Sequence, residues 1–159
     1  MLARTRGHNR GAERAIAAYS RLGEHAACWL ILGAAGTLLD PDPDRARGWR
    51  RGVKIVACAY GLNYTVKIAV RRRRPELLGL PPLTGTVSRL SFPSAHATSS
   101  FAAARAFGKL APGAALYSAA GAFAISRPYL GVHYPSDVVA GALLGTAIAG
   151  LWPRRGEAQ

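Results

Sequence analysis

The sequence has few acidic residues, lysines and cysteines. It has eight acidic residues among 159, and three of its 21 basic residues are lysines. The acidic residues form no paired-carboxylate arrangement, and no His-x-x-x-His pattern is present, so we expect neither a metal site nor a cofactor. The two cysteines, Cys28 and Cys58, lie inside apolar stretches without metal or redox spacing. We expect both to be reduced packing residues.

Long apolar runs are also missing, although half of the residues are hydrophobic. A spanning helix usually needs about 20 residues. The five apolar segments here are shorter, and they cover residues 25–39, 53–70, 94–110, 113–126 and 136–152. Their glycines, such as Gly141 and Gly145 at GxxxG spacing, favour close helix packing in lipid. A soluble helical bundle is the alternative, but its core would usually contain more Leu, Ile and Phe. We therefore predict an all-α integral membrane bundle of about five transmembrane helices.

Charge is strongly one-sided, with a formal net charge of +13. The basic residues lie between the apolar segments and not along one polar face, so nucleic acid is not an expected partner. Residues 9–22 have a helical period that separates arginines from an apolar side, as in a helix that lies in the membrane interface. The predicted organisation is a basic tail with this amphipathic helix over 1–24, a membrane-embedded domain over 25–152 and a short tail over 153–159.

Three blocks of polar residues stand out in a fixed order. The first is Lys67, followed after six intervening residues by Arg74-Pro75. The second is the run Pro93-Ser94-Ala95-His96. The third is Ser126-Arg127, then His133, then Asp137. Together they supply cations, a hydroxyl, two imidazoles and a carboxylate, which suits metal-free phosphoryl transfer through a histidine.

In order and spacing the blocks closely resemble the signature of the type 2 phosphatidic acid phosphatase superfamily, which also includes the vanadium haloperoxidases. The resemblance runs from Lys67 to Asp137. It implies that His133 is the nucleophile, that Asp137 orients it, and that His96 is the general acid and then the base for water. It also implies a phosphate-binding set, which comprises Lys67, Arg74, Ser94, Ala95 and Arg127. The superfamily usually has glycine where Ala95 stands. We expect this difference to affect which ligand shapes the pocket accepts.

Local structure near the blocks can be predicted too. If the second helix continues to the end of the first block, Lys67, Arg71 and Arg74 share one face, and Arg72 and Arg73 point toward lipid headgroups. Arg71 has no assigned role. Pro93 is expected to begin the third helix, which would turn the N–H groups of residues 94–96 toward an anion.

The function that this resemblance implies is hydrolysis of a lipid-linked phosphate, with membrane lipids as the surroundings. Residues 90–98 most resemble decaprenylphosphoryl-phosphoribose phosphatases; polyprenyl diphosphates and phospholipid phosphates remain open as substrates. The alternatives are a non-catalytic lipid-binding or scaffold protein and a vanadate-dependent haloperoxidase. The protein is expected in the cell membrane as a multi-pass protein with a cytoplasm-facing site, and its oligomeric state is open.

Overall fold

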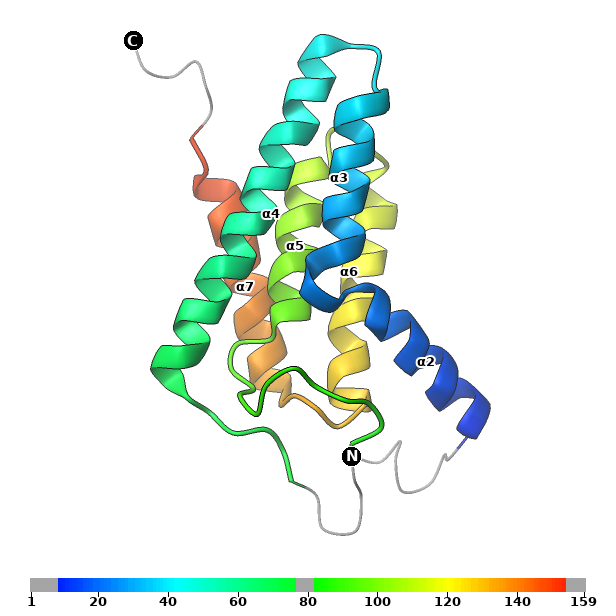
Figure 1. The fold of residues 1–159 in the computed structure, drawn as a ribbon, viewed down its shortest axis with the longest axis vertical. Coiled ribbons are helices and arrows are strands. Elements are labelled where there is room, and N and C mark those ends of the chain that lie inside the picture. Colours follow the sequence, from blue (N-terminus) through cyan, green and yellow to red (C-terminus); the bar gives the residue numbers. More distant parts are fainter. Residues whose placement is uncertain (1–8, 77–81, 154–159) are drawn as a thin grey trace.

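A computed structural model describes residues 9–76 and 82–153. These residues confirm the predicted all-α class, and Figure 1 shows the helices as a bundle. The elements are α2 (Arg10–Leu22), η1 (Glu24–Ala26), α3 (Ala27–Leu39), α4 (Pro43–Val70), α5 (Ala95–Phe107), α6 (Gly113–Tyr129) and α7 (Pro135–Leu151). The first eight residues of the predicted basic tail and the end of the C-terminal tail lie outside the described residues.

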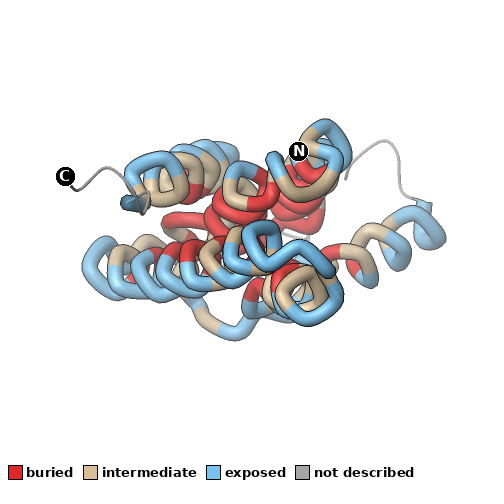
Figure 2. The backbone as a smooth tube through the Cα atoms, turned by 90° about the horizontal axis from the view of Figure 1, so that it is seen from above, coloured by how far each residue is buried: buried red, intermediate tan, exposed pale blue. Residues whose placement is uncertain are grey.

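Helix α5 is the centre of the bundle and packs against α4, α6 and α7. Its residues are mostly buried, and Figure 2 shows the buried part of the chain gathered between the outer helices. The largest apolar cluster includes Trp29, Trp49, Phe107 and Phe123, which come from α3, α4, α5 and α6. One apolar core therefore ties these four helices together.

The contact between α5 and α7 depends on small residues. A Cβ atom on Gly141 would lie 2.6 Å from the backbone oxygen of Ser94, and one on Gly145 would lie 2.1 Å from that of Thr98. Neither position has room for a side chain, so the two backbones approach closely. The close packing predicted from the GxxxG spacing is confirmed.

The predicted number of spanning helices is not confirmed. Within the described residues, α4 is the one helix with the length and apolar content to cross a membrane, at 28 residues. Helix α2 with η1 and α3 would provide a second such segment, bent by 47°. Helix α7 is apolar but shorter. The five-span arrangement stays a prediction.

Several boundaries differ from expectation because of proline. Helix α4 begins at Pro43, about ten residues earlier than predicted, because Asp42 caps it and proline suits the first helical position. Pro128 lies in the last turn of α6 and does not stop it. Pro93 precedes the cap of α5, so that helix starts at Ala95. Cys58 is exposed, whereas the sequence predicted a packing residue.

Candidate active site

The three blocks meet in one cavity of about 120 Å³. The block residues that line it are Lys67, Arg74, Ala95, His96, Arg127 and His133. Three cations and two imidazoles therefore face the same enclosed space, although they come from α4, α5, α6 and two loops. The remaining walls come from the α2–α3 junction, from α4 and from the segment Gly85–Ser88, and these walls were not predicted.

Lys67 is buried in the last turn of α4. Its Nζ donates to the carbonyl oxygen of Pro93 at 2.9 Å and lies 3.4 Å from that of Leu90. An ammonium group has three hydrogens, so one remains for a ligand. Asn63, one turn earlier, donates to the same Pro93 oxygen at 3.3 Å and to Thr98 at 2.9 Å. These contacts hold the first block against the second.

Arg74 does not reach the site on a helical face, so that prediction is wrong. Helix α4 ends at Val70, because Arg71 adopts a left-handed conformation with φ 53°. Arg71 is exposed and donates back to the oxygen of Ile68 at 3.1 Å. Arg74 lies in the irregular segment that follows. Its Nε donates to the Ser88 oxygen at 2.8 Å and its Nη1 to the Val132 oxygen at 2.7 Å.

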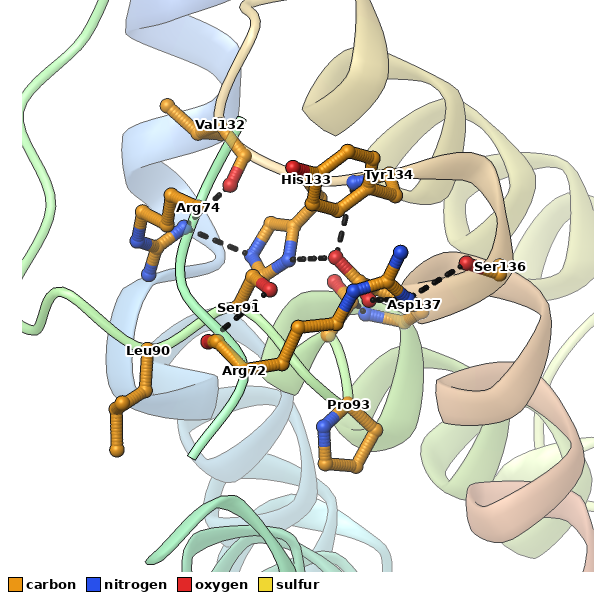
Figure 3. A network of polar contacts seen from close by, with 12 residues as sticks. Arg72, Arg74, Leu90, Ser91, Pro93, Val132, His133, Tyr134, Ser136 and Asp137 are labelled. Atoms are coloured by element: carbon orange, nitrogen blue, oxygen red, sulfur yellow. Dashed lines mark hydrogen bonds and ion pairs between the residues drawn. The ribbon is translucent and has the colours of Figure 1, made fainter. Parts of the chain in front are cut away.

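The contact with Arg74 shows which nitrogen of His133 has the lone pair. Nη1 of Arg74 lies 3.1 Å from Nε2 of His133 (Figure 3). A guanidinium can only donate, so Nε2 accepts and the ring hydrogen is on Nδ1. Nδ1 lies 3.5 Å from Oδ2 of Asp137, which is an ion-pair distance and longer than a hydrogen bond. The ring is thus oriented with its lone pair on the side of the Arg74 guanidinium.

The surroundings of His133 also keep its ring neutral. The pKa of His133 is lowered from 6.5 to about 4, with burial as the largest cause. The cations Arg74, Arg127 and Lys67 contribute to this lowering, and the contact with Asp137 opposes it. A neutral ring at pH 7 is the state that a nucleophile requires.

Asp137 has a second partner that the sequence analysis assigned elsewhere. Its carboxylate is fully buried and accepts the N–H of Tyr134 at 2.9 Å. Arg72 donates to Oδ1 of Asp137 at 3.0 Å and to Ser136 at 2.9 Å (Figure 3). The prediction that Arg72 points toward lipid headgroups is therefore wrong. The end of α4 at Val70 redirects both Arg72 and Arg74, and Pro75 was a usable signal, because a residue before proline disfavours helix.

The second block forms the first turn of α5. Ser94 caps this helix, and its Oγ lies 3.5 Å from the N–H of Ala97. The Ser94 N–H donates to the backbone oxygen of Asp137 at 3.0 Å, so it is not directed at a ligand as predicted. The N–H groups of Ala95 and His96 occupy the first two helical positions and have no partner inside the helix. They remain the backbone donors of this block.

His96 and Arg127 are both held by Ser20, which belongs to the last turn of α2. Nε2 of His96 lies 2.9 Å from the Ser20 carbonyl oxygen, and Nη1 of Arg127 donates to the Ser20 hydroxyl. The amphipathic pattern predicted α2 but not this contribution. Part of the apolar side of α2 packs on α6, where Tyr19 stacks on Phe123 with 4.3 Å between ring centroids.

Comparison with known proteins shows the family of this chain. Residues 53–158 match the PAP2 superfamily. The chain belongs to this superfamily. It is 43% identical over 124 residues to a decaprenylphosphoryl-5-phosphoribose phosphatase of Mycolicibacterium smegmatis, which covers 78% of this chain and 68% of the relative. It is 39% identical over 132 residues to the protein of that name in Mycobacterium tuberculosis. This match covers 83% of this chain and 73% of that protein.

A more distant relative and a solved structure extend the comparison. A lipid A 1-phosphatase of Rhizobium etli is 35% identical over 88 residues, which is 50% of this chain and 38% of that protein. The crystal structure of a transmembrane PAP2-type phosphatidylglycerolphosphate phosphatase from Bacillus subtilis has the same fold. Its TM-score is 0.69 at 24% identity, with 94% of this chain and 79% of that chain covered. These relatives are phosphatases, and the PAP2 chain described here is a phosphoric ester hydrolase.

Proposed function

We propose that this PAP2 protein is a membrane lipid phosphatase that works through a phosphohistidine at His133. The observation that carries the proposal is the orientation of His133 in the cavity. Its Nε2 lone pair lies 3.1 Å from Nη1 of Arg74, and Lys67 and Arg127 line the same space. The cations would neutralise the phosphate oxygens and bring phosphorus within reach of the nucleophile.

The proposed reaction has two steps. Nε2 of His133 attacks phosphorus, the bond to the lipid-side oxygen breaks, and His96, protonated on both ring nitrogens at this stage, gives its Nδ1 proton to that oxygen. Water then attacks the phosphohistidine, His96 takes a proton from the water, the P–N bond breaks and inorganic phosphate leaves. Asp137 stabilises the positive charge of the phosphorylated ring. Lys67, Arg74 and Arg127 supply the positive charge that a divalent ion supplies in other phosphatases.

The proposed substrate is a polyprenyl-phosphoribose phosphate. Support comes from the relatives at 39–43% identity, which are decaprenylphosphoryl-5-phosphoribose phosphatases. The other lining of the cavity offers further support, because it includes Glu24, His25, Tyr60 and Tyr64. Carboxylate, imidazole and phenol groups suit a leaving group with hydroxyls, such as a sugar.

The test is phosphate release from a panel of lipids by the purified protein in detergent, with His133→Ala as the matched control. The panel contains decaprenylphosphoryl-5-phosphoribose, undecaprenyl diphosphate, phosphatidylglycerophosphate and phosphatidic acid. We expect decaprenylphosphoryl-5-phosphoribose to have the highest kcat/KM. If another lipid has a higher kcat/KM, that lipid is the substrate instead. Release from none would favour the scaffold reading, and halide oxidation with peroxide would favour the haloperoxidase.

For the membrane placement we propose five spans with the cavity facing the cytoplasm. The amphipathic α2 lies at the cavity end of the bundle, and the anionic cytoplasmic leaflet attracts such basic segments. Val87 at this end and Arg47 near the start of α4 are both exposed. In a background without Cys28 and Cys58, Val87→Cys should resist an impermeant thiol reagent in intact cells, whereas Arg47→Cys should react. The reverse labelling pattern would mean that the cavity faces the outside of the cell. Equal labelling at the two positions would contradict the proposal that α4 crosses the membrane.

A further inference from the structure

The last turn of α2 contacts two cavity-lining residues through one buried residue, Ser20. Its relative exposure is 0%, in a helix whose other residues are mostly exposed. The backbone oxygen and the side-chain hydroxyl of Ser20 contact two different site residues, His96 and Arg127. Ser20 belongs to none of the three blocks and lies more than 40 residues before the first of them.

The backbone contact selects the ring nitrogen of His96 that faces the reaction. A carbonyl oxygen only accepts, so Nε2 of His96 carries the hydrogen in this 2.9 Å contact. Nδ1 is then the nitrogen that remains for the leaving oxygen and for water. Gly23 packs against the same edge of the ring, because a Cβ atom there would lie 2.9 Å from Cδ2 of His96, the carbon next to Nε2. The end of α2 therefore fixes both the tautomer and the position of this imidazole.

The hydroxyl contact holds the guanidinium of Arg127. This side chain is buried, and its Nε has no hydrogen-bond partner in the described part of the chain. Within residues 9–76 and 82–153, the Arg127 side chain has one hydrogen-bond acceptor, which is the Ser20 hydroxyl. The nearby Ser126 hydroxyl donates to the backbone oxygen of Phe123 at 2.7 Å. It lies 3.4 Å from the Ser20 hydroxyl. Ser20 is thus the group that sets the direction of Arg127.

We infer that Ser20 is a positioning residue that aligns His96 and Arg127 with each other. The inference rests on the roles given to these two residues under the proposed function. It makes the end of α2 part of the catalytic unit, in addition to the membrane contact expected of an amphipathic helix. A single residue from outside the blocks then connects the acid–base group with a phosphate-binding cation.

Ser20→Ala tests the hydroxyl while it leaves the backbone oxygen in place. We expect the dissociation constant for orthovanadate to rise about tenfold, because a hydrogen bond to a charged group is lost. kcat/KM should fall by a similar factor, since vanadate resembles the transferring phosphoryl group. Ser20→Thr, which keeps a hydroxyl, should restore most of both. Ser99→Ala is the matched control, because Ser99 is also buried in the bundle. Its hydroxyl donates to the backbone oxygen of Ala95 at 3.0 Å and contacts no site cation.

Gly23→Ala tests the packing of the α2 end against His96. The added methyl would lie 2.9 Å from Cδ2 of His96 and 2.9 Å from the Phe123 ring. It should displace the imidazole, so kcat should fall at least tenfold while the vanadate constant changes less than threefold. Melting temperatures in detergent verify that each variant is folded. If Ser20→Ala does not fold, Ser20→Cys gives the same comparison, because sulfur is a poor acceptor.

The outcomes separate this inference from the proposed function. Equal vanadate constants for Ser20→Ala and Ser99→Ala, in a protein whose wild type releases phosphate, would overturn the role of Ser20 alone. A wild type that releases no phosphate from any lipid would overturn the proposed function. Vanadate binding would still measure the link between Ser20 and Arg127, and a tenfold loss in Ser20→Ala would support it.

Discussion

Arg72 holds the carboxylate of Asp137 from the side opposite His133. Its Nη1 lies 3.0 Å from Oδ1 of Asp137, and its guanidinium carbon lies 4.1 Å from the centre of the Tyr134 ring. The carboxylate is fully buried, whereas the Arg72 side chain is 38% exposed. A cation from the first block therefore balances a buried charge in the third.

Loss of this pair should impair the orientation of His133. We expect Arg72→Ala to lower kcat at least tenfold, because a buried carboxylate without its partner is destabilised and the group that stabilises the imidazolium shifts. Arg73→Ala is the matched control, since Arg73 is the neighbouring arginine and is exposed. Steady-state kinetics of both variants give the comparison. Equal kcat values in the two would show that Asp137 does not depend on Arg72.

The titration of His133 should be shifted to acid. Its pKa of about 4 in the folded protein lies below the 6.5 of an ordinary histidine, because burial disfavours the charged ring. The ring is then neutral and able to attack above about pH 4, and it loses nucleophilicity only as the pH falls through that value. Nitrogen NMR of histidine-labelled protein in detergent measures this, with His133→Ala to assign the signal. A midpoint at or above 6.5 would contradict the account.

Activity should not depend on divalent metal ions. Lys67, Arg74 and Arg127 line the cavity and supply the positive charge that phosphoryl transfer needs. We expect excess EDTA to change kcat/KM less than twofold and orthovanadate to inhibit competitively. Loss of activity with EDTA that Mg²⁺ or Mn²⁺ restores would mean that a metal ion takes part.

The contact between α5 and α7 should tolerate no side chain at Gly145. A Cβ atom there would meet the Thr98 backbone oxygen at 2.1 Å, so Gly145→Ala must push the helices apart. Gly61→Ala in α4 is the control, because nothing lies within 4 Å of its Cβ position and alanine favours helix. Melting temperatures in detergent should fall clearly for the first variant and stay equal or rise for the second. A similar change in both would contradict the close packing.

Much of the fold could be predicted because its signals are local. Proline, aspartate and glycine mark most helix ends, and the GxxxG spacing marks the α5–α7 contact. The blocks identified the cations and imidazoles of the cavity, since their types and spacing follow the chemistry. The directions of Arg72 and Arg74 were missed, because the end of α4 depends on the left-handed conformation of Arg71. That conformation has no counterpart in the apolar pattern.

Ser20 could not be predicted for a different reason. It lies on a helix whose period was clear, but a serine on an amphipathic helix is usually solvated. Its role depends on the 47° bend between α2 and the following helix, which brings it against α5 and α6. Two left-handed residues, His25 and Ala26, make that bend. Histidine is enriched in this conformation but alanine is not, and the pair has no recognisable signal in the sequence. Contacts across a bend of this kind follow from tertiary packing and not from spacing.

The most direct test of the account is a search for phosphorus on His133. The wild type and His96→Ala are mixed with a substrate labelled in the terminal phosphate, stopped with base, which preserves phosphohistidine, and analysed by mass spectrometry. We expect label on the peptide that contains His133, with more of it in His96→Ala because its hydrolysis is slower, and none in His133→Ala. Turnover of His133→Ala at a near-normal rate, or label on another residue, would contradict the central claim.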